Sequence, residues 1–412
     1  MVKSIRIFTY LALLFSSFTI WFSLGAWLRI NFFFICVALF FSAINELSKF
    51  RSIIVFQKNT DEQRIWMNIF LTFVVASYCY NTMYNWNSKL NSNTLAILFL
   101  ILLMYYCYSS IVERYISIEN GIKWMARGSV LLMSIVFVDS ILVNFAHIKI
   151  HDLFVWGLEG NTDYFYRGFW ISPCAPTAEP GDAGQIMNVL IPFSIYYFKG
   201  RKRMIVIALY FFDLFSLFSS TTLLEFLLVP TCLLAFQNRK NKKYAITYII
   251  VFAIGVFLYT RVQGGSSFSS ISADWSFIDK VTLSGNTGSD SERQTSWLIA
   301  IQDGLTHPIF GRGAGIDKAI VDNRLLIPTY LSTWLAFFAY FGVFAFIAFA
   351  LFWSTFFRKC LKLNGTFKNM FLFSFICNTI NGVVGEYYPV FVFWAVLPFI
   401  NKAYNENLCK HK

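Results

Sequence analysis

Twelve apolar segments follow one another along this chain, each long enough or nearly long enough to cross a bilayer as a helix. A transmembrane helix needs about 20 mostly apolar residues. Two closely spaced pairs, 204–219 with 221–236 and 369–385 with 388–401, could each form a re-entrant hairpin or two short spans, so we expect 10–12 spans. The twelve segments are 7–25, 30–45, 65–82, 93–112, 128–147, 184–198, 204–219, 221–236, 245–260, 329–356, 369–385 and 388–401.

The composition agrees with a membrane protein and excludes a soluble one. Apolar residues make up 57% of the 412 residues and charged residues only 14%, whereas an average soluble domain has about 45–50% and about 25%. So few charged side chains cannot cover the surface of a core of this size. The sequence therefore predicts an all-α polytopic membrane protein in which residues 1–412 form a single integral membrane domain. We expect the first segment to remain as an anchor rather than to be cleaved, because further spans follow it.

The distribution of Lys and Arg predicts the orientation in the membrane. With the N-terminus in the cytoplasm and strict alternation of the spans, 24 of the 34 basic residues fall on the cytoplasmic side. The short outer loops hold only Arg29 and Lys89. Such an excess of positive charge inside is typical of multi-span proteins, so both termini are expected to be cytoplasmic. The net charge of +12 is then a topology signal, and we expect no nucleic-acid partner.

Two long outer loops remain, and they are where chemistry is expected. The first covers residues 148–183 and the second residues 261–328. The second loop contains an amphipathic stretch, 292–305, whose apolar positions predict a short helix. The cytoplasmic segments are short and basic and leave no room for a catalytic domain, so any reaction is expected on the outer face or within the membrane.

The first outer loop carries an arginine among aromatic residues and an acid at the entrance to the next span. Arg167 lies in the run that includes Tyr166 and Trp170, and Glu179 directly precedes Pro180. Arginine suits bidentate contact with a phosphate. The alternative is an interfacial aromatic belt with a snorkelling arginine. Glu179 could equally be a helix-start acid that interacts favourably with the helix dipole.

The second outer loop offers Arg293 at the start of the amphipathic stretch and Arg312 within a glycine-rich turn. Arg293 could bind an anion or could be a solvated helix-start charge paired with a neighbouring acid. The turn 311–315 lacks the P-loop pattern; its backbone amides could approach an anion, or it could be a plain flexible turn. Asp290 and Glu292 form only a weak metal motif.

Three polar residues, Asp322, Asn323 and Arg324, stand just before the span at 329–356. Asp322 could act as a general base or could simply begin the helix. Glu386 lies at the outer tip of the last pair of apolar segments. It could line a cavity together with these residues.

Three acids lie inside apolar segments, where ionisable groups are either functional or hold helices together by hydrogen bonds. These acids are Asp139, Asp213 and Glu225. The four histidines lack zinc-ligand spacing and the eight cysteines contain no C-x-x-C pair, so we expect no metal, no cofactor and no disulfide framework.

The order of these motifs is similar to that of a known family. An arginine is followed by Glu179-Pro180 before a mid-chain span, then by Ser-Ser-Thr-Thr at 219–222 and by Arg293 leading to the turn at 307–315. Asp322-Asn323 and a long aromatic span complete the pattern. The chain resembles the bacterial O-antigen polymerase/ligase superfamily, and most closely its Wzy-type repeat-unit polymerases. The resemblance covers mainly residues 160–350.

This resemblance implies a C-type glycosyltransferase fold in the bacterial inner membrane and an inverting, metal-independent transfer on the periplasmic face. The donor would be a glycan on undecaprenyl diphosphate, and the acceptor the terminal sugar of a new lipid-linked repeat unit. Membrane lipid, a chain-length regulator and a flippase would be the other partners. The family's loop arginines contact the diphosphate, and Arg167 and Arg293 stand at the matching places.

The resemblance also implies roles for the candidate site residues. The catalytic candidates are Arg167, Glu179, Arg293 and Asp322, and the substrate-binding candidates are Tyr166, Trp170, Arg312, Asn323 and Arg324. Ligases usually have His-Asn where this chain has Asp322-Asn323, which favours a polymerase over an O-antigen ligase. The alternative outside enzymology is a flippase or transporter of lipid-linked oligosaccharides; such proteins tend to show repeated halves, and no repeat is evident in the sequence.

Overall fold

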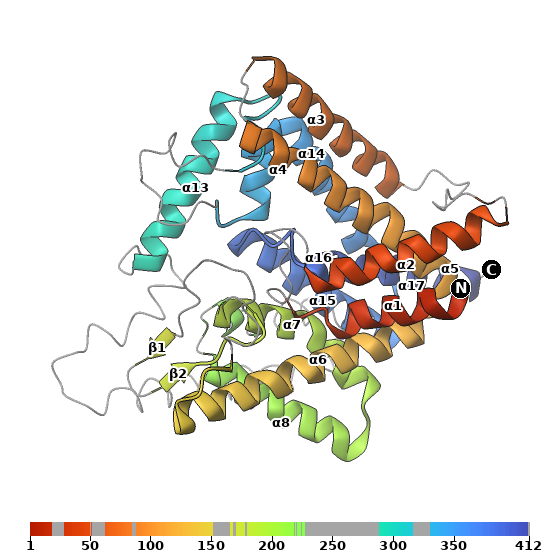
Figure 1. Cartoon of the computed structure of the whole chain (residues 1–412), viewed down its shortest axis with the longest axis vertical. Coiled ribbons are helices and arrows are strands. Elements are labelled where there is room, and N and C mark those ends of the chain that lie inside the picture. The colour runs from red at the N-terminus through yellow and green to blue at the C-terminus, as the bar shows by residue number, and fades with distance from the viewer. Residues whose placement is uncertain are drawn as a thin grey trace.

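The computed structural model describes most of the chain as helices (Figure 1). The described residues are 1–18, 29–49, 51, 62–84, 88–150, 165–167, 170–177, 179–217, 219, 221–223, 225–226, 288–315 and 330–410. The elements in the first half are α1 (Val2–Leu14), α2 (Ile30–Leu47), α3 (Glu62–Tyr84), α4 (Ser88–Ile101), η1 (Leu102–Tyr108), α5 (Ser109–Tyr115), α6 (Ile118–Ile141), η2 (Leu142–Ala146), β1 (Phe165–Arg167) and β2 (Trp170–Ser172). The later ones are α7 (Pro180–Tyr197), α8 (Gly200–Ser216), α13 (Gly288–Thr306), α14 (Thr333–Lys362), α15 (Gly365–Val384), α16 (Phe391–Ala395) and α17 (Leu397–Lys410).

Four helical segments in the described part of the chain are long and apolar enough to cross a membrane: α2, the continuous stretch Leu90–Tyr115, the stretch Ile118–Ala146, and α14. The molecule is therefore an all-α membrane protein. The predicted segments 65–82, 184–198, 204–219 and 369–385 largely overlap α3, α7, α8 and α15, which do not combine the length and the apolar composition of those four candidate spans. The first predicted segment, 7–25, overlaps α1 as far as Leu14, and its residues 19–25 lie outside the described residues.

The last predicted span, 388–401, is not one helix. It is divided into α16 and α17, which begins at Leu397. The break lies at Val396, and Pro398 in the first turn of α17 has no N–H with which to donate a helical hydrogen bond back to α16. The predicted segment 245–260 lies outside the described residues, and so does 221–236 except for residues 221–223 and 225–226.

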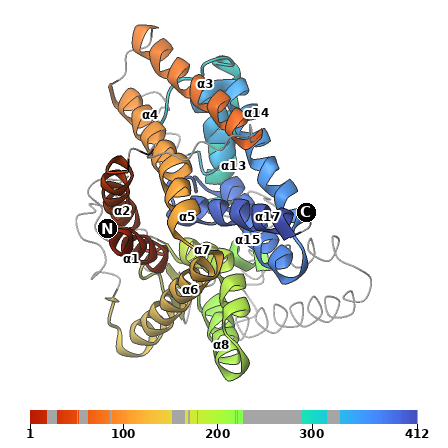
Figure 2. The ribbon, with the colours of Figure 1, turned by 90° about the vertical axis from the view of Figure 1, so that its right-hand side faces the viewer.

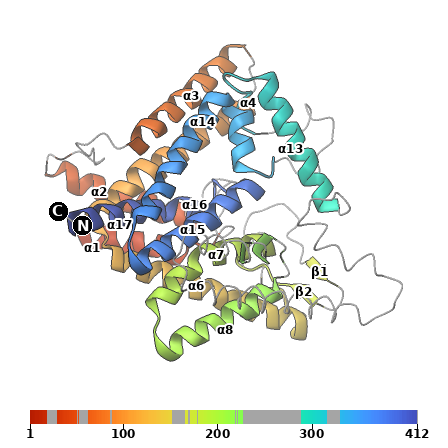
Figure 3. The same ribbon diagram turned by 180° about the vertical axis from the view of Figure 1, so that it is seen from behind.

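Helix α14 organises one half of the molecule. It packs against α3, α13 and α15. In Figures 1 and 3, α3 and α13 lie with α14 in the upper half of the molecule. The contact with α3 is aromatic: the ring of Phe70 lies 5.3 Å from that of Phe337 and 5.2 Å from that of Phe349. Phe70, Phe337 and Phe349 are fully buried, so stacking adds to the stabilisation that burial of apolar area provides.

Helices α6, α7 and α8 form the other half, and α7 joins the two halves by packing against α15 (Figure 2). Ser194 of α7 donates a hydrogen bond to the Ala126 carbonyl of α6 at 3.1 Å. Gly184 of α7 lies against Thr222, and a Cβ at this position would stand 2.0 Å from the Thr222 hydroxyl oxygen. The small residue therefore allows a close approach that a larger side chain would prevent.

Both termini lie at the same side of the molecule (Figure 1). Arg6 donates to the Tyr115 carbonyl at 3.0 Å, and the Lys402 ammonium donates to the Ile116 carbonyl at 2.6 Å. We call this side, with Arg6 and Lys402, the basic end. Arg6 and Lys402, which the distribution of basic residues predicts on the cytoplasmic side, thus lie at the same end of the molecule.

Candidate functional site

The head of α7 lies away from the basic end and brings acids together. Glu179 is the N-cap residue and is exposed, and Pro180 occupies the first helical turn together with Asp182. The Glu179 carbonyl accepts hydrogen bonds from the Ala183 amide at 3.3 Å and the Thr177 hydroxyl at 2.8 Å. Acids at this position are stabilised by the helix dipole, so Glu179 does start a helix, as one of its two interpretations predicts.

Arg29 faces this helix start from another part of the chain. It is the N-cap residue of α2 but makes no capping hydrogen bond with its side chain. One terminal nitrogen of its guanidinium is buried and has no hydrogen-bond partner among the described residues. Burial lowers the pKa of Arg29, while the charge of Asp182 and the hydroxyl of Tyr387 act in the opposite direction. A desolvated arginine with an unused donor is suited to bind an anion.

Asp182 has the electrostatics of a proton-transfer group. The pKa of its carboxyl is raised to about 7, mainly by burial and also by the nearby charge of Glu179, while Arg29 acts in the opposite direction. A carboxyl that titrates near neutrality can accept a proton at physiological pH. We refer to Arg29, Glu179, Asp182 and Tyr387 as the α7-head cluster.

A buried polar layer lies behind the α7-head cluster. Asn188, two turns further along α7, donates to the Glu225 carboxylate at 2.8 Å and to the Thr222 carbonyl at 3.0 Å. Tyr210 of α8 donates to the Asn188 side-chain oxygen at 2.8 Å. Glu225 therefore links α7 to the following segment, as the packing interpretation of this acid predicts.

Asp139 also joins parts of the fold. Its Oδ2 accepts hydrogen bonds from the backbone amides of Cys174 and Ala175 at 3.0 and 3.1 Å. Both amides lie in the segment that leads to the α7 head, so Asp139 ties α6 to the chain just before the candidate site. Asp213 is buried in α8, and neither of its carboxylate oxygens has a hydrogen-bond partner among the described residues.

Arg312 does not have the open position expected of a substrate-binding residue. It is buried, forms an ion pair with Asp303 at 2.9 Å and donates to the Gly315 carbonyl at 3.2 Å. The same Asp303 accepts a hydrogen bond from the Tyr330 hydroxyl, over whose ring the guanidinium lies. These contacts hold the glycine-rich turn in place, while the buried Nε of Arg312 has no hydrogen-bond partner among the described residues. The substrate-binding role of Arg312 therefore stays a prediction.

The backbone amides of the glycine-rich turn are also occupied. Gly342 interrupts α14 with φ 85° and ψ 177°, which leaves carbonyls of the preceding turn without helical partners. The amides of Arg312 and Gly313 donate to the carbonyls of Ala339 and Tyr340 at 3.1 and 3.0 Å. With these two amides the turn completes the hydrogen bonding of a kinked helix, so they are not available to an anion.

Glu386 contributes to the same internal network. Its Oε1 accepts hydrogen bonds from the Tyr330 amide at 2.8 Å and from the Tyr340 hydroxyl at 3.0 Å. The carboxylate thus fixes the chain that enters α14 against the loop after α15. The neighbouring Tyr387, in contrast, has a buried hydroxyl without a hydrogen-bond partner among the described residues.

The Trp170 side chain makes a hydrogen bond within the protein, and the neighbouring aromatic run forms a short β-hairpin that includes Trp170. Arg167 pairs with Trp170, and Tyr166 with Ile171, in the antiparallel strands β1 and β2. The Trp170 indole donates to the Ser216 carbonyl at 3.1 Å, so its N–H is used within the protein. The side chains of Tyr166 and Arg167 lie outside what the structure describes.

Arg293 lies in α13, which contains the amphipathic stretch 292–305, and is half-buried. One turn later the Trp297 indole donates to the Leu331 carbonyl at 3.1 Å. Two residues after Leu331, the Thr333 hydroxyl accepts a hydrogen bond from the Tyr387 amide at 2.7 Å. The middle of α13 is therefore linked, through the chain at 331–333, to the segment that carries Tyr387. Asp322, Asn323 and Arg324 lie outside the described residues.

A comparison with models of known protein families finds no match, and neither does a comparison with curated proteins.

Arg29, Asp182 and Tyr387 were not among the site residues that the sequence suggested. Arg29 carried one signal, because it is one of only two basic residues in the short outer loops. Asp182 carried another, as a second acid two residues after Pro180. Neither signal relates the two residues to each other, since their proximity depends on how α2 packs against the rest of the fold.

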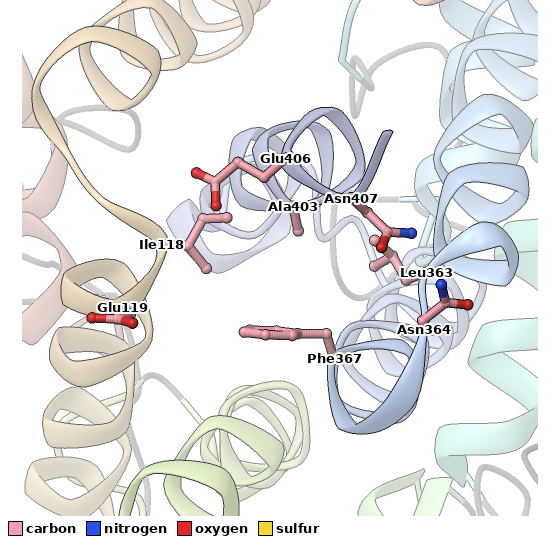
Figure 4. A pocket seen from close by; sticks show the side chains of 8 residues that line it. All are labelled: Ile118, Glu119, Leu363, Asn364, Phe367, Ala403, Glu406 and Asn407. Atoms are coloured by element: carbon pink, nitrogen blue, oxygen red, sulfur yellow. The ribbon is translucent and has the colours of Figure 1, made fainter. Parts of the chain in front are cut away.

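A cavity of about 160 Å³ lies at the basic end, beside the start of α6 (Figure 4). Glu119 and Glu406 line it together with Asn364 and Asn407, and the ring of Phe367 projects toward its middle. This acidic cavity is far along α6 from Asp139 and is separate from the α7-head cluster.

Proposed function

We propose that this protein is a membrane glycosyltransferase that polymerises lipid-linked polysaccharide repeat units. It would transfer the growing glycan from undecaprenyl diphosphate to the terminal sugar of a new unit, on the periplasmic face of the bacterial inner membrane and with both termini in the cytoplasm. The observation that carries this proposal is the α7-head cluster, in which a guanidinium donor of Arg29 has no hydrogen-bond partner among the described residues and stands near a carboxyl, Asp182, whose pKa lies near 7.

The chemistry requires an anion-binding cation and a base. In the proposed step the acceptor hydroxyl oxygen attacks the anomeric carbon of the donor, and the bond from that carbon to the diphosphate oxygen breaks with its electron pair. Arg29 stabilises the negative charge that grows on the diphosphate. Asp182 takes the proton of the acceptor hydroxyl. Arg29 thereby has the role that the sequence gave to Arg167 and Arg293, and these two could contact the remainder of the diphosphate.

The rest of the fold suits a lipid-linked substrate. A polyprenyl tail needs an apolar path between helices, and α2, α6 and α14 are apolar enough to lie in a bilayer. Glu179 is exposed at the α7 head, where it could contact the sugar of either substrate. The proposed C-type glycosyltransferase fold, with about twelve spans, would place this cluster at the outer end of the helices.

Deletion of the gene in its host tests the proposed function. We expect surface polysaccharide reduced to core plus a single repeat unit, and a wild-type copy should restore the ladder on a gel. Loss of every repeat from the core, with polymer retained on the lipid carrier, would instead identify a ligase. Repeat units trapped on the cytoplasmic leaflet would identify a flippase, and either result would overturn the proposal.

The pH dependence of polymerisation gives a prediction about Glu179. If Asp182 is the base, the rate rises with pH through about 7, because the carboxyl must lose its proton and its pKa is about 7. Glu179→Gln removes a negative charge that raises this pKa, so the rise should move to lower pH. The measurement is the initial rate of ladder formation between pH 5 and 9 on purified protein, within the range where such groups titrate.

Asp182→Asn is the matched variant for this profile. It should reduce the rate and abolish the dependence on pH near 7. A Glu179→Gln profile that coincides with that of the wild type would show that Asp182 is not the group that titrates.

A further inference from the structure

A second cavity, of about 320 Å³, lies between the end of α7 and the start of α15. Its wall is mainly apolar and includes Ile191, Ile195 and Phe373. Ile195 is 39% exposed, so an apolar side chain of the wall is open to whatever surrounds the protein. The volume is at the lower end of the range of about 300–1,000 Å³ that is usual for small-molecule sites. We call this cavity the α7–α15 groove.

Two cations stand at one end of the groove. Lys199 and Arg203 line it, and no acid does. The Arg203 Nε donates to the Phe198 carbonyl at 2.9 Å, and the Lys199 ammonium lies 5.1 Å from the centre of the Tyr196 ring. Neither cation forms an ion pair with an acid among the described residues. Both are therefore positioned by the protein and keep charge available for a ligand.

The groove lies among helices of the membrane. On one side α7 packs against α6, and on the other α15 packs against α14; α6 and α14 belong to the segments long and apolar enough to cross a bilayer. Lys199 stands two residues after the end of α7, and the basic residues Arg201 and Lys202 follow it at the start of α8. An apolar wall with cations at one end matches a lipid, whose chain is apolar and whose headgroup carries a phosphate.

The acidic cavity next to the groove strengthens this assignment. The two cavities lie on either side of the contact between Tyr196 and Phe367, whose rings are 5.3 Å apart. Glu119 and Glu406 line one cavity, whereas the groove has only cations. The charges are thus segregated, and only the groove is complementary to an anion.

We propose that the α7–α15 groove binds an anionic glycerophospholipid, with the phosphate between Lys199 and Arg203 and one acyl chain along Ile195 and Phe373. Basic pockets between membrane helices recognise anionic headgroups in this way. Pro192 helps to form the wall, because a proline inside α7 removes one backbone hydrogen bond and widens the helix locally. This site is at the opposite end of α7 from Asp182 and does not depend on the proposed transferase activity.

Native mass spectrometry of the purified full-length protein tests the site. The probes are phosphatidylglycerol and phosphatidylcholine with identical acyl chains. We expect one phosphatidylglycerol to be retained in preference to phosphatidylcholine. Each cation near a headgroup contributes a factor of about five in affinity, so Lys199→Ala combined with Arg203→Ala should reduce the preference on the order of 20-fold.

Two further variants separate the groove from general attraction to a basic surface. Arg201→Ala combined with Lys202→Ala removes the same charge from exposed side chains that do not line the groove, and should leave the preference unchanged. Ile195→Trp fills the apolar part while it keeps both cations, and should also displace the lipid. Equal retention of the two lipids by the wild type, or an equal loss in the Arg201/Lys202 variant, would overturn the proposal.

Discussion

Arg29→Ala is expected to abolish polymer formation while the protein still folds and inserts. The variant removes the guanidinium that would stabilise the departing diphosphate, and loss of one such donor typically lowers a rate by about 10²–10³-fold. Arg29 makes no capping hydrogen bond, so helix α2 does not depend on its side chain. The measurement is the length distribution of surface polysaccharide in a deletion strain that carries the variant.

Two variants control this prediction. Arg29→Lys keeps the charge but loses the planar fork of donors, and should restore a short ladder only. Arg358→Ala removes an arginine whose ion pair with Glu62 is exposed at 51% and 53%, and exposed pairs contribute only about 0–1 kcal/mol. A full ladder with Arg29→Ala, at wild-type protein level, would contradict the role given to this residue.

Gly311→Ala should strongly destabilise the protein. Gly311 has φ +64°, and an added Cβ would stand 2.2 Å from both the carbonyl carbon and the carbonyl oxygen of Tyr340. Backbone atoms at the kink of α14 cannot move without losing the hydrogen bonds from Arg312 and Gly313. Overpacking and the left-handed backbone together should lower the free energy of unfolding by about 2–4 kcal/mol. Thermal unfolding of the solubilised protein measures this effect.

Gly365→Ala is the matched control. Gly365 has φ +59°, and no atom lies within 4 Å of an added Cβ. This variant therefore meets only the backbone penalty of about 1–2 kcal/mol. If the two alanine variants unfold at the same temperature, the glycine-rich turn is not seated in the kink of α14 as described.

The sequence predicts the helices well because their apolar faces recur locally. The segments 30–45, 93–112, 128–147 and 329–356 correspond to the four helical stretches that could cross a membrane. The last predicted span, 388–401, is divided at Val396 between α16 and α17, because hydropathy counts apolar residues and does not register that Pro398 has no N–H for a helical hydrogen bond.

The candidate site was predicted less well, because its members come from distant parts of the chain. Glu179 was identified because it precedes a proline at the start of a helix. Arg29 and Asp182 become site candidates only in the folded protein, where the starts of α2 and α7 lie close together. Arg312 appeared to be a ligand-binding residue, since a basic residue in a glycine-rich turn is common at anion sites. Its partner Asp303 lies at the end of α13, and nothing in the sequence shows that this carboxylate turns toward the arginine.

The role of the acids within apolar segments also depends on contacts that the sequence does not show. Asp139 and Glu225 were either functional or structural from sequence, and hydrogen bonds to Cys174, Ala175 and Asn188 give both a structural role. Such bonds depend on the distance between helices that hydropathy does not specify. Sequence therefore locates buried polar groups but does not distinguish those that bind a ligand from those that bind a neighbouring helix.

The most direct test of the central claim is polymerisation by the purified protein in lipid vesicles. Single repeat units linked to undecaprenyl diphosphate would be supplied from the host, and products would be separated by length. We predict a ladder of lipid-linked glycans, one undecaprenyl diphosphate released for each linkage formed, and neither product with Arg29→Ala. Repeat units that cross the vesicle membrane without elongation would contradict the proposed transferase.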